Sequence, residues 1–463
     1  MGDSSAVDLS RVAGRTILVC GVGLAGSSAA RALLAAHAQV QLTARTRGDS
    51  VDGLLDAGAT WAGPLDSVPA AVELIIASPG IHPDDTLLLD AATRAVPVWG
   101  EAELAWQLRG HRAAPWLAVT GTNGKTTTVH MLEAMLVAAG LRAVAVGNVG
   151  VSMIEAVLAD PPYDVLAVEL SSQQLHFAPS LAPAAGAILN LAPDHLDWHG
   201  TFERYVEAKA RMFSGAAVAI GNADDPAVAR LLATCSAATR VSFTLAAPGP
   251  DQLGVCVAQL VSRAFGDDGL VLIGTDAVRP PGQLNVANAL AAAALARAQG
   301  VPAAAIADGL RRFVADPHRN QYLVTIDGVA YVDDSKATNA HAARGSLLAY
   351  QRIVWVAGGQ LKGASVDELV AEVSSRLAAV VLLGADRAVI ADAVRRHAPE
   401  IPLIEVANTD DRAMLEVVRA AAGLARPGDT VLLAPAGASY DMYANYSARG
   451  RAFEAAAREL GEG

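Results

Sequence analysis

Lysine is scarce in this chain. Only four of the 35 basic residues are lysines, which leaves 31 arginines. A surface that needs only positive charge can use arginine, whereas lysine provides a compact ammonium group and, once deprotonated, a nucleophilic amine. Each lysine also lies in a segment with the composition of a ligand site. We therefore treat all four as candidate functional residues: Lys125, Lys209, Lys336 and Lys362.

Cysteine and long apolar runs are also scarce. The three cysteines, Cys20, Cys235 and Cys256, cannot all pair and lack metal-binding spacing, which favours a reducing compartment. No uncharged apolar run reaches the roughly 18 residues of a membrane span, and the alanine-rich stretch 287–296 ends at Arg297. The opening residues, MGDSSAVDLSRVAG, lack the basic and apolar regions of a secretory signal. These absences predict a cytoplasmic protein that does not span a membrane.

Positive charge is in deficit as well. Acidic residues number 47 against 35 basic ones, so the formal net charge is −12 at pH 7. This balance argues against nucleic acid or an anionic membrane as a partner. It does not exclude anionic substrates, because lysines and helix N-termini can reverse the potential inside a cleft. We expect small-molecule substrates and a monomeric protein.

The order of apolar segments predicts an α/β fold. The 463 residues correspond to about three domains, and an apolar fraction of 52% supplies ample core. Strands alternate with helices along the chain, which predicts mostly parallel sheets covered on both faces. We place the domains at residues 1–102, 103–315 and 316–463. Beyond the first 70 residues the expected strands are Val72–Ala77, Trp116–Thr120, Val165–Leu170, Ala187–Asn190, Ala216–Ile220, Ile353–Ala357, Val380–Leu383 and Thr430–Leu433.

The strongest local signal is a phosphate loop after the apolar strand Trp116–Thr120. Loops of this kind bind phosphate oxygens with backbone N–H groups at a helix N-terminus, while the lysine reaches the outer phosphates and a hydroxyl binds Mg²⁺. The usual spacing asks for glycine at position 119, where this chain has Val119, so the loop is a shortened form. The segment predicts an ATP site formed by Gly121, Thr122, Asn123, Gly124, Lys125, Thr126 and Thr127.

A second glycine motif lies near the N-terminus. The strand Arg15–Gly21 leads into the G-x-G-x-x-G spacing of Gly21, Gly23 and Gly26, before a helix expected to start near Ser27. The next strand ends in Thr43, Ala44 and Arg45 rather than in the acidic residue of an NAD site. NADP binding through Arg45 and Arg47 is an alternative, and so is a turn that only packs the helix closely against the strand.

Three side chains of the middle segment could serve a metal ion. Glu169 ends the strand 164–170, at the carboxyl edge of the sheet where ligands bind in open α/β folds. His195 follows the strand 187–191, and a loop histidine without a ligand role is an equal alternative. Lys209 lies on a helix expected over 202–213, where a solvated lysine near Glu203 and Glu207 is the alternative.

Together these segments resemble the Mur ligases of peptidoglycan synthesis, over nearly the whole chain. The strings that carry the resemblance are TGTNGKTTT, ELSSQQL, NLAPDHLDWHG with AKARMF, NVANALAA, PHR, DDSKATN and APAGASYDMYANYSARG. The resemblance implies a Rossmann-like N-terminal domain that binds a UDP-substrate, a central ATPase domain and a Rossmann-like C-terminal domain. Within the family, the DSKATN and ASYD strings are most similar to members that add D-glutamate to UDP-N-acetylmuramoyl-L-alanine.

The resemblance also implies a mechanism. The γ-phosphate of ATP would pass to the substrate carboxylate, and the amine of D-glutamate would attack the acyl phosphate, with release of ADP and phosphate. Lys125 and Thr126 would hold the phosphates and one Mg²⁺ beside Glu169, and His195 would serve a second Mg²⁺. Lys209 resembles the family's carbamylated lysine, in which CO₂ converts the amine into a hard oxygen ligand.

The remaining roles follow from the same resemblance. ATP would also contact Asn288, Arg319 and Asp334, with Asn285 and His318 beside them. The UDP-substrate would contact Gly23, Leu24, Ala25, Ser78, Pro79, Gly80, Asn148 and His195. D-Glutamate would contact Thr338, Lys362, Ser439 and Tyr446, with Lys336 near the transferred phosphate. Ser439 could equally be a helix cap and Tyr446 a core aromatic. The family's Asp-Thr-Arg run is replaced by Ala44, Arg45 and Thr46, which leaves the uracil contacts open.

Three other functions stay open on the sequence. The first is a Mur or folylpolyglutamate-type ligase with a different acceptor. The second is a phosphate-loop ATPase switch or binding protein that performs no ligation. The third is an NADP-dependent oxidoreductase that uses the N-terminal glycine motif.

Overall fold

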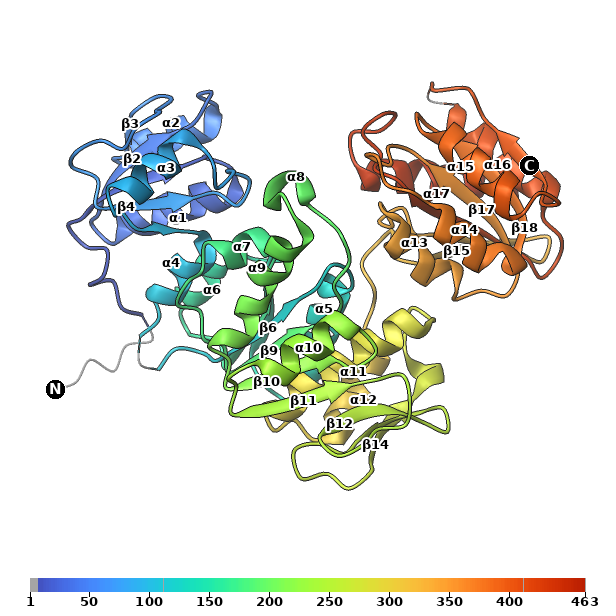
Figure 1. Cartoon of the computed structure of the whole chain (residues 1–463), viewed down its shortest axis with the longest axis horizontal. Coiled ribbons are helices and arrows are strands. Elements are labelled where there is room, and N and C mark those ends of the chain that lie inside the picture. Colours follow the sequence, from blue (N-terminus) through green and yellow to red (C-terminus); the bar gives the residue numbers. More distant parts are fainter. Residues whose placement is uncertain (1–6, 111, 411, 463) are drawn as a thin grey trace. The chain divides into compact units, whose positions relative to one another are not determined.

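The computed structural model describes residues 7–110, 112–410 and 412–462, and it divides into two compact units (Figure 1). Unit 1 comprises Met1–Ala277 with Ala287–Phe313, and unit 2 comprises Val278–Val286 with Val314–Gly463. No described helix is long and apolar enough to cross a membrane. Each unit is described separately below.

The first sheet of unit 1 is entirely parallel, in the order β3-β2-β1-β4-β5. Its strands are β1 (Thr16–Cys20), β2 (Gln39–Thr43), β3 (Thr60–Trp61), β4 (Leu74–Ala77) and β5 (Val98–Trp99). The accompanying helices are α1 (Leu24–Ala35), α2 (Asp49–Asp56), α3 (Thr86–Thr93) and α4 (Glu101–Gln107). Helix α1 begins at Leu24, three residues before the expected start at Ser27, because the glycine loop is only three residues long.

Gly26 sets the approach of α1 to β1. A Cβ built on Gly26 would lie 1.9 Å from the carbonyl oxygen of Gly21, so no larger residue fits without a backbone shift. The close helix-to-strand packing expected of the third glycine is therefore present.

We expect Gly26→Ala to lower the free energy of unfolding by about 1 to 3 kcal/mol, the usual effect of overpacking. Gly23→Ala is the matched control, because a Cβ at Gly23 meets nothing within 4 Å. Denaturant unfolding of both variants measures the difference, and equal losses would contradict the packing argument.

The second sheet of unit 1 has nine strands in the order β14-β13-β12-β11-β10-β9-β6-β8-β7. Its strands are β6 (Trp116–Thr120), β7 (Ala143–Gly147), β8 (Val165–Glu169), β9 (Ala185–Ile188), β10 (Val218–Asn222), β11 (Thr239–Phe243), β12 (Gln252–Cys256), β13 (Gln259–Ser262) and β14 (Leu270–Gly274). The helices are α5 (Lys125–Ala138), α6 (Met153–Val157), α7 (Ser172–His176), α8 (Leu196–His199), α9 (Phe202–Ser214), α10 (Pro226–Thr234), α11 (Gln283–Ala298) and α12 (Ala303–Arg312). Only the pairs β12–β13 and β13–β14 are antiparallel.

Unit 2 contains a six-stranded sheet in the order β15-β16-β20-β17-β18-β19. Its strands are β15 (Gln321–Ile326), β16 (Val329–Asp333), β17 (Ile353–Gly358), β18 (Leu377–Leu383), β19 (Leu403–Glu405) and β20 (Thr430–Ala436). The helices are α13 (Ala340–Leu347), α14 (Asp367–Val373), α15 (Arg387–His397), α16 (Ala413–Leu424) and α17 (Tyr446–Glu462). Only the edge strand β15 runs antiparallel to its neighbour.

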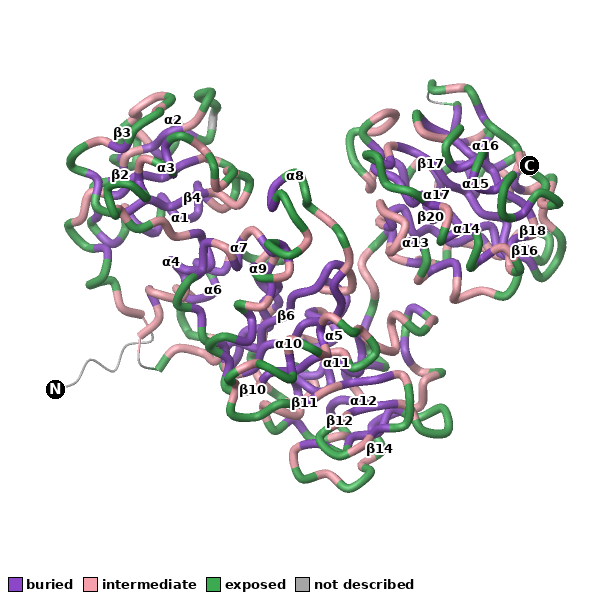
Figure 2. The backbone as a smooth tube through the Cα atoms, in the orientation of Figure 1, coloured by how far each residue is buried: buried purple, intermediate pink, exposed green. Residues whose placement is uncertain are grey.

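The expected α/β class with mostly parallel sheets is confirmed. Buried residues follow the strands and the inward faces of the helices (Figure 2). Separate apolar clusters lie on the two faces of the unit 2 sheet, which is why its strands β17 and β20 are buried along their whole length. This arrangement leaves the carboxyl ends of parallel strands as the natural place for ligands.

Candidate active site

The phosphate loop connects β6 to the N-terminus of α5, as the sequence predicts. Gly124 precedes the helix with φ of +84°, and no side chain caps the first turn. A Cβ on Gly124 would lie 2.3 Å from the Oδ1 atom of Asn288, so this asparagine packs directly on the loop. The loop thus presents backbone N–H groups and the helix dipole to an anion, the arrangement that binds phosphate.

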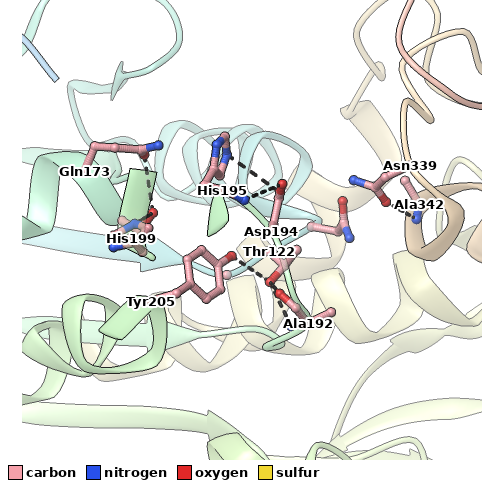
Figure 3. Close-up of polar contacts among 12 residues, drawn as sticks. Thr122, Gln173, Ala192, Asp194, His195, His199, Tyr205, Asn339 and Ala342 are labelled. Atoms are coloured by element: carbon pink, nitrogen blue, oxygen red, sulfur yellow. Dashed lines mark hydrogen bonds and ion pairs between the residues drawn. The ribbon is translucent and has the colours of Figure 1, made fainter. Parts of the chain in front are cut away.

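Asn190 and Tyr205 hold the loop in shape. The backbone N–H of Asn123 donates to Asn190 Oδ1 at 2.8 Å, and Asn190 Nδ2 donates back to the carbonyl of Asn123 at 3.1 Å. Thr122 Oγ1 lies 2.8 Å from the Tyr205 hydroxyl and accepts from the backbone N–H of Ala192, contacts that Figure 3 shows. The sequence motifs assigned no role to Asn190 or Tyr205, although Asn190 opens the string NLAPDHLDWHG and Tyr205 lies three residues before AKARMF.

Lys125 and Lys209 meet at one carbonyl group. Lys125 Nζ donates to the carbonyl of Gly121 at 2.9 Å, and Lys209 Nζ donates to the same oxygen at 2.9 Å. Lys209 is only 2% exposed and also donates to Thr120 Oγ1, so the solvated-lysine alternative is wrong. Burial lowers the pKa of Lys209 well below its ordinary value, and the neighbouring charge of Lys125 lowers it further.

Glu169 ends β8 beside the phosphate loop and is 2% exposed. Its Oε2 atom is buried and has no hydrogen-bond partner among the described residues. A buried carboxylate oxygen without a partner is costly, and a bound cation would remove that cost. The Thr126 hydroxyl stands on the first turn of α5, so β8 and α5 each contribute one oxygen ligand of the kind Mg²⁺ prefers. No cluster of three or more His, Cys, Asp or Glu side chains with metal-site geometry occurs in the described ranges.

His195 lies in the loop that follows β9, immediately before α8. Its backbone is left-handed, with φ of +51°, and its Nε2 atom lies 3.7 Å from Asp194 Oδ2. About half of its side chain is exposed, so it is available to a ligand. Figure 3 shows it beside Asp194. Three residues later, Trp198 Nε1 donates to the carbonyl of Ile81 at 3.2 Å. The His195 loop is therefore tied to the loop that carries Ser78, Pro79 and Gly80.

Most of the residues expected to contact the UDP-substrate lie at the carboxyl edge of the first sheet. Gly23, Leu24 and Ala25 follow β1, and Ser78 follows the neighbouring strand β4, with its hydroxyl donating to Gly21 O at 2.9 Å. Leu24 is 96% exposed. Asn148 lies apart from these strands, in an exposed position just after β7.

The carboxyl edge of the unit 2 sheet gathers the other two lysines. Lys336 Nζ lies 3.9 Å from the ring centroid of Tyr446, so these two candidates are in contact. Lys362 is exposed with φ of +53°, and Ser439 is 2% exposed. Tyr446 is half-buried at the first residue of α17 and belongs to neither of the two apolar clusters described on the faces of this sheet, so it is not a core aromatic. Ser439 does not cap α17, which begins seven positions later.

Asp334 and His318 are buried parts of the same edge. Ser346 donates to Asp334 through its hydroxyl, Asn320 donates through its backbone N–H, and burial raises the pKa of Asp334 to about 7. His318 Nδ1 lies 2.6 Å from Asp333 Oδ2, so this histidine is committed to an internal pair. Arg319 is paired with Asp316 at 3.3 Å.

Comparison with known families gives two matches. Residues 119–296 match the Mur ligase middle domain, and residues 318–437 match the Mur ligase glutamate ligase domain. The UDP-N-acetylmuramoylalanine--D-glutamate ligase of Streptomyces coelicolor is 52% identical, over 98% of this chain and 99% of its own length. The enzyme of the same name from Thermobifida fusca is 52% identical, over 96% of this chain and 99% of its own length.

Solved structures share the fold at low sequence identity. A pseudomurein peptide ligase type C from Methanothermus fervidus aligns with a TM-score of 0.59 and 19% identity, over 96% of this chain and all of that one. UDP-N-acetylmuramate-alanine ligase from Thermotoga maritima aligns with a TM-score of 0.58 and 18% identity, over 96% of this chain and 99% of that one. At these identities the likeness concerns the fold alone.

Proposed function

Because this chain belongs to the Mur ligase family, we propose that it joins D-glutamate to UDP-N-acetylmuramoyl-L-alanine with cleavage of ATP to ADP and phosphate. The proposal is supported by relatives of that name that are 52% identical over nearly the whole chain. The observation that carries the chemistry is the phosphate loop, where the Nζ atoms of Lys125 and Lys209 both donate to the carbonyl of Gly121.

The first step activates the carboxylate of the UDP-substrate. A carboxylate oxygen attacks the γ-phosphorus of ATP, the bond to the β,γ-bridging oxygen breaks, and ADP leaves. Backbone N–H groups of residues 121–124 and the α5 dipole bind the phosphates, and Lys125 balances the charge that develops on them. Thr127, Asn288, Arg319 and Asp334 are proposed as further ATP contacts.

Mg²⁺ fits the donor set at this loop. When bound, it would neutralise phosphate charge, with Thr126 and Glu169 as its oxygen ligands. The unpartnered Oε2 of Glu169 is the observation that supports this assignment. We propose His195 as the residue at a second Mg²⁺, on the basis of its exposure beside Asp194.

Lys209 is proposed to carry a carbamate. Only a neutral amine attacks CO₂, and burial shifts Lys209 toward the neutral amine by lowering its pKa well below the ordinary value. The carbamate would extend the side chain by a carboxylate beyond Nζ, the atom that donates to Gly121 and Thr120, and would thereby supply oxygen ligands for a hard cation.

The second step forms the amide. The amine nitrogen of D-glutamate attacks the acyl carbon, the carbon–oxygen bond to phosphate breaks, and the amine loses a proton. We propose that Lys336 serves the transferred phosphate, and that the two carboxylates of D-glutamate require separate clamps. The candidates for the clamps are Thr338, Lys362, Ser439 and Tyr446.

Lys362→Ala is expected to raise KM for D-glutamate about tenfold or more, because a substrate carboxylate would lose a charged partner. KM for ATP and for the UDP-substrate should change by less than about twofold. Alanine and lysine both carry a Cβ, so the left-handed backbone at position 362 adds no difference in strain. Arg395→Ala, at an exposed arginine of α15, is the control. A parallel rise of all three constants would remove Lys362 from the amino-acid pocket.

A phosphate-release assay tests the proposed function. The protein is incubated with ATP, Mg²⁺ and UDP-N-acetylmuramoyl-L-alanine, and D- and L-amino acids are added one at a time. Release that depends on D-glutamate supports the proposal, and release with another acceptor assigns the chain to a different Mur ligase activity. Release without any acceptor supports an ATPase, and NADP-dependent absorbance change without ATP would support the oxidoreductase alternative.

A further inference from the structure

Arg449 is a fully buried cation in the first turn of α17. It is 1% exposed and forms none of the ion pairs found in the described part of the chain. Burial lowers its pKa to about 10, so the guanidinium still carries its charge at neutral pH. A buried charge is expensive unless hydrogen bonds satisfy it, and its presence calls for a role.

The guanidinium is satisfied by oxygens from three separate loops. Its Nε and Nη2 donate to the hydroxyl and the carbonyl of Ser335, each at 3.0 Å. Its Nη1 donates to the carbonyl of Gly437 at 3.0 Å and to that of Gly358 at 3.3 Å. These residues stand at the carboxyl ends of β16, β20 and β17, which are parallel neighbours in the sheet.

The loop after β17 packs closely against the guanidinium. A Cβ on Gly359 would lie 2.2 Å from the carbonyl of Ala438 and 3.1 Å from Nη1 of Arg449. Ser335 Oγ, which accepts from Arg449, donates to the carbonyl of Tyr446 at 2.7 Å. One planar group with five donors thus fixes the loops that follow β16, β17 and β20, together with the start of α17. The single nitrogen of lysine cannot form the same set of hydrogen bonds.

We propose that Arg449 is a positioning residue, which holds the loops after β16, β17 and β20 in the arrangement that receives the incoming amino acid. Those loops carry Lys336, Lys362 and Ser439 respectively. The inference rests on the proposed function in one respect, namely that these loops form the D-glutamate pocket.

The test uses Arg449→Lys in the full chain, which retains the charge but loses the planar fork. Arg458→Lys is the matched control, because Arg458 lies on the same helix with 69% of its side chain exposed. Hydrogen–deuterium exchange is measured for residues 334–340, 357–364 and 436–442. We expect these loops to exchange about tenfold faster or more in Arg449→Lys, with residues 119–126 unchanged. KM for D-glutamate should rise about tenfold, while KM for ATP and the UDP-substrate stays within about twofold.

Ser335→Ala is the second variant, because it removes one acceptor of Arg449 and leaves the guanidinium in place. It should loosen residues 334–340 more than the other two loops, which keeps the test decisive if Arg449→Lys does not fold. Unchanged exchange in all three loops would overturn the positioning role, whatever reaction the protein catalyses. Loosened loops with an unchanged KM for D-glutamate would overturn the link to the amino-acid pocket. If the wild-type protein releases no phosphate in response to D-glutamate, the proposed function is refuted. Hydrogen–deuterium exchange would still decide the role of Arg449.

Discussion

Lys209→Ala is expected to lower kcat/KM by about 100-fold or more, the usual loss when a group that stabilises developing charge is removed. The substitution deletes a side chain that is 2% exposed and contacts both Thr120 and Gly121 at the phosphate loop. Steady-state phosphate release with all three substrates measures the loss, and thermal unfolding checks that the fold persists.

Short carboxylic acids distinguish a carbamate from a bare amine at position 209. Acetate carries two oxygens on a small anion, so it can enter the space left by the deleted side chain and partly restore turnover. The matched control is Lys125→Ala, which acetate should not rescue. Restored activity in Lys209→Arg, or an unmodified amine by mass spectrometry in bicarbonate, would count against the carbamate.

Lys125→Ala is expected to abolish turnover without unfolding the protein. Lys125 is only half-buried, and its ammonium group contacts loop carbonyls rather than core side chains. Loss of its charge should weaken the binding and transfer of the ATP phosphates far more than it disturbs the packing of β6 or α5. The thermal midpoint of the variant should lie within a few degrees of that of the wild type, about the shift that 1 kcal/mol produces in a domain of this size.

Single-turnover formation of ADP measures the chemical step in Lys125→Ala directly. A variant that keeps more than about a tenth of wild-type kcat/KM would have lost less than about 1.4 kcal/mol of transition-state stabilisation. That result would show that Lys125 does not act on the transferred phosphate. Lys125→Arg separates charge from shape, because arginine retains the charge but cannot fold back onto the same two carbonyls in the same way.

The two glycine motifs illustrate what a sequence conveys well. A strand, a glycine turn and a helix N-terminus are contiguous in the chain, so the geometry around Gly124 and Gly26 follows from a few neighbouring residues. The start of α1 was expected three residues too late, since a helix boundary depends on capping that the pattern alone leaves undefined. The antiparallel strands β12–β14 were not among the expected strands, because an edge hairpin depends on pairing rather than on periodicity.

The sequence by itself determined the α/β class and the phosphate loop, and it identified the four lysines as candidates. Each of these depends only on local spacing and composition. Only the tertiary structure brings Lys209 to the carbonyl of Gly121, 88 residues away, and Asn190 to the phosphate loop. It also buries Arg449 among the loops that follow three strands. Such contacts depend on which strands become neighbours and on which faces of the helices are buried. A sheet brings the ends of distant segments together at one edge, and only the folded chain decides which side chains meet there.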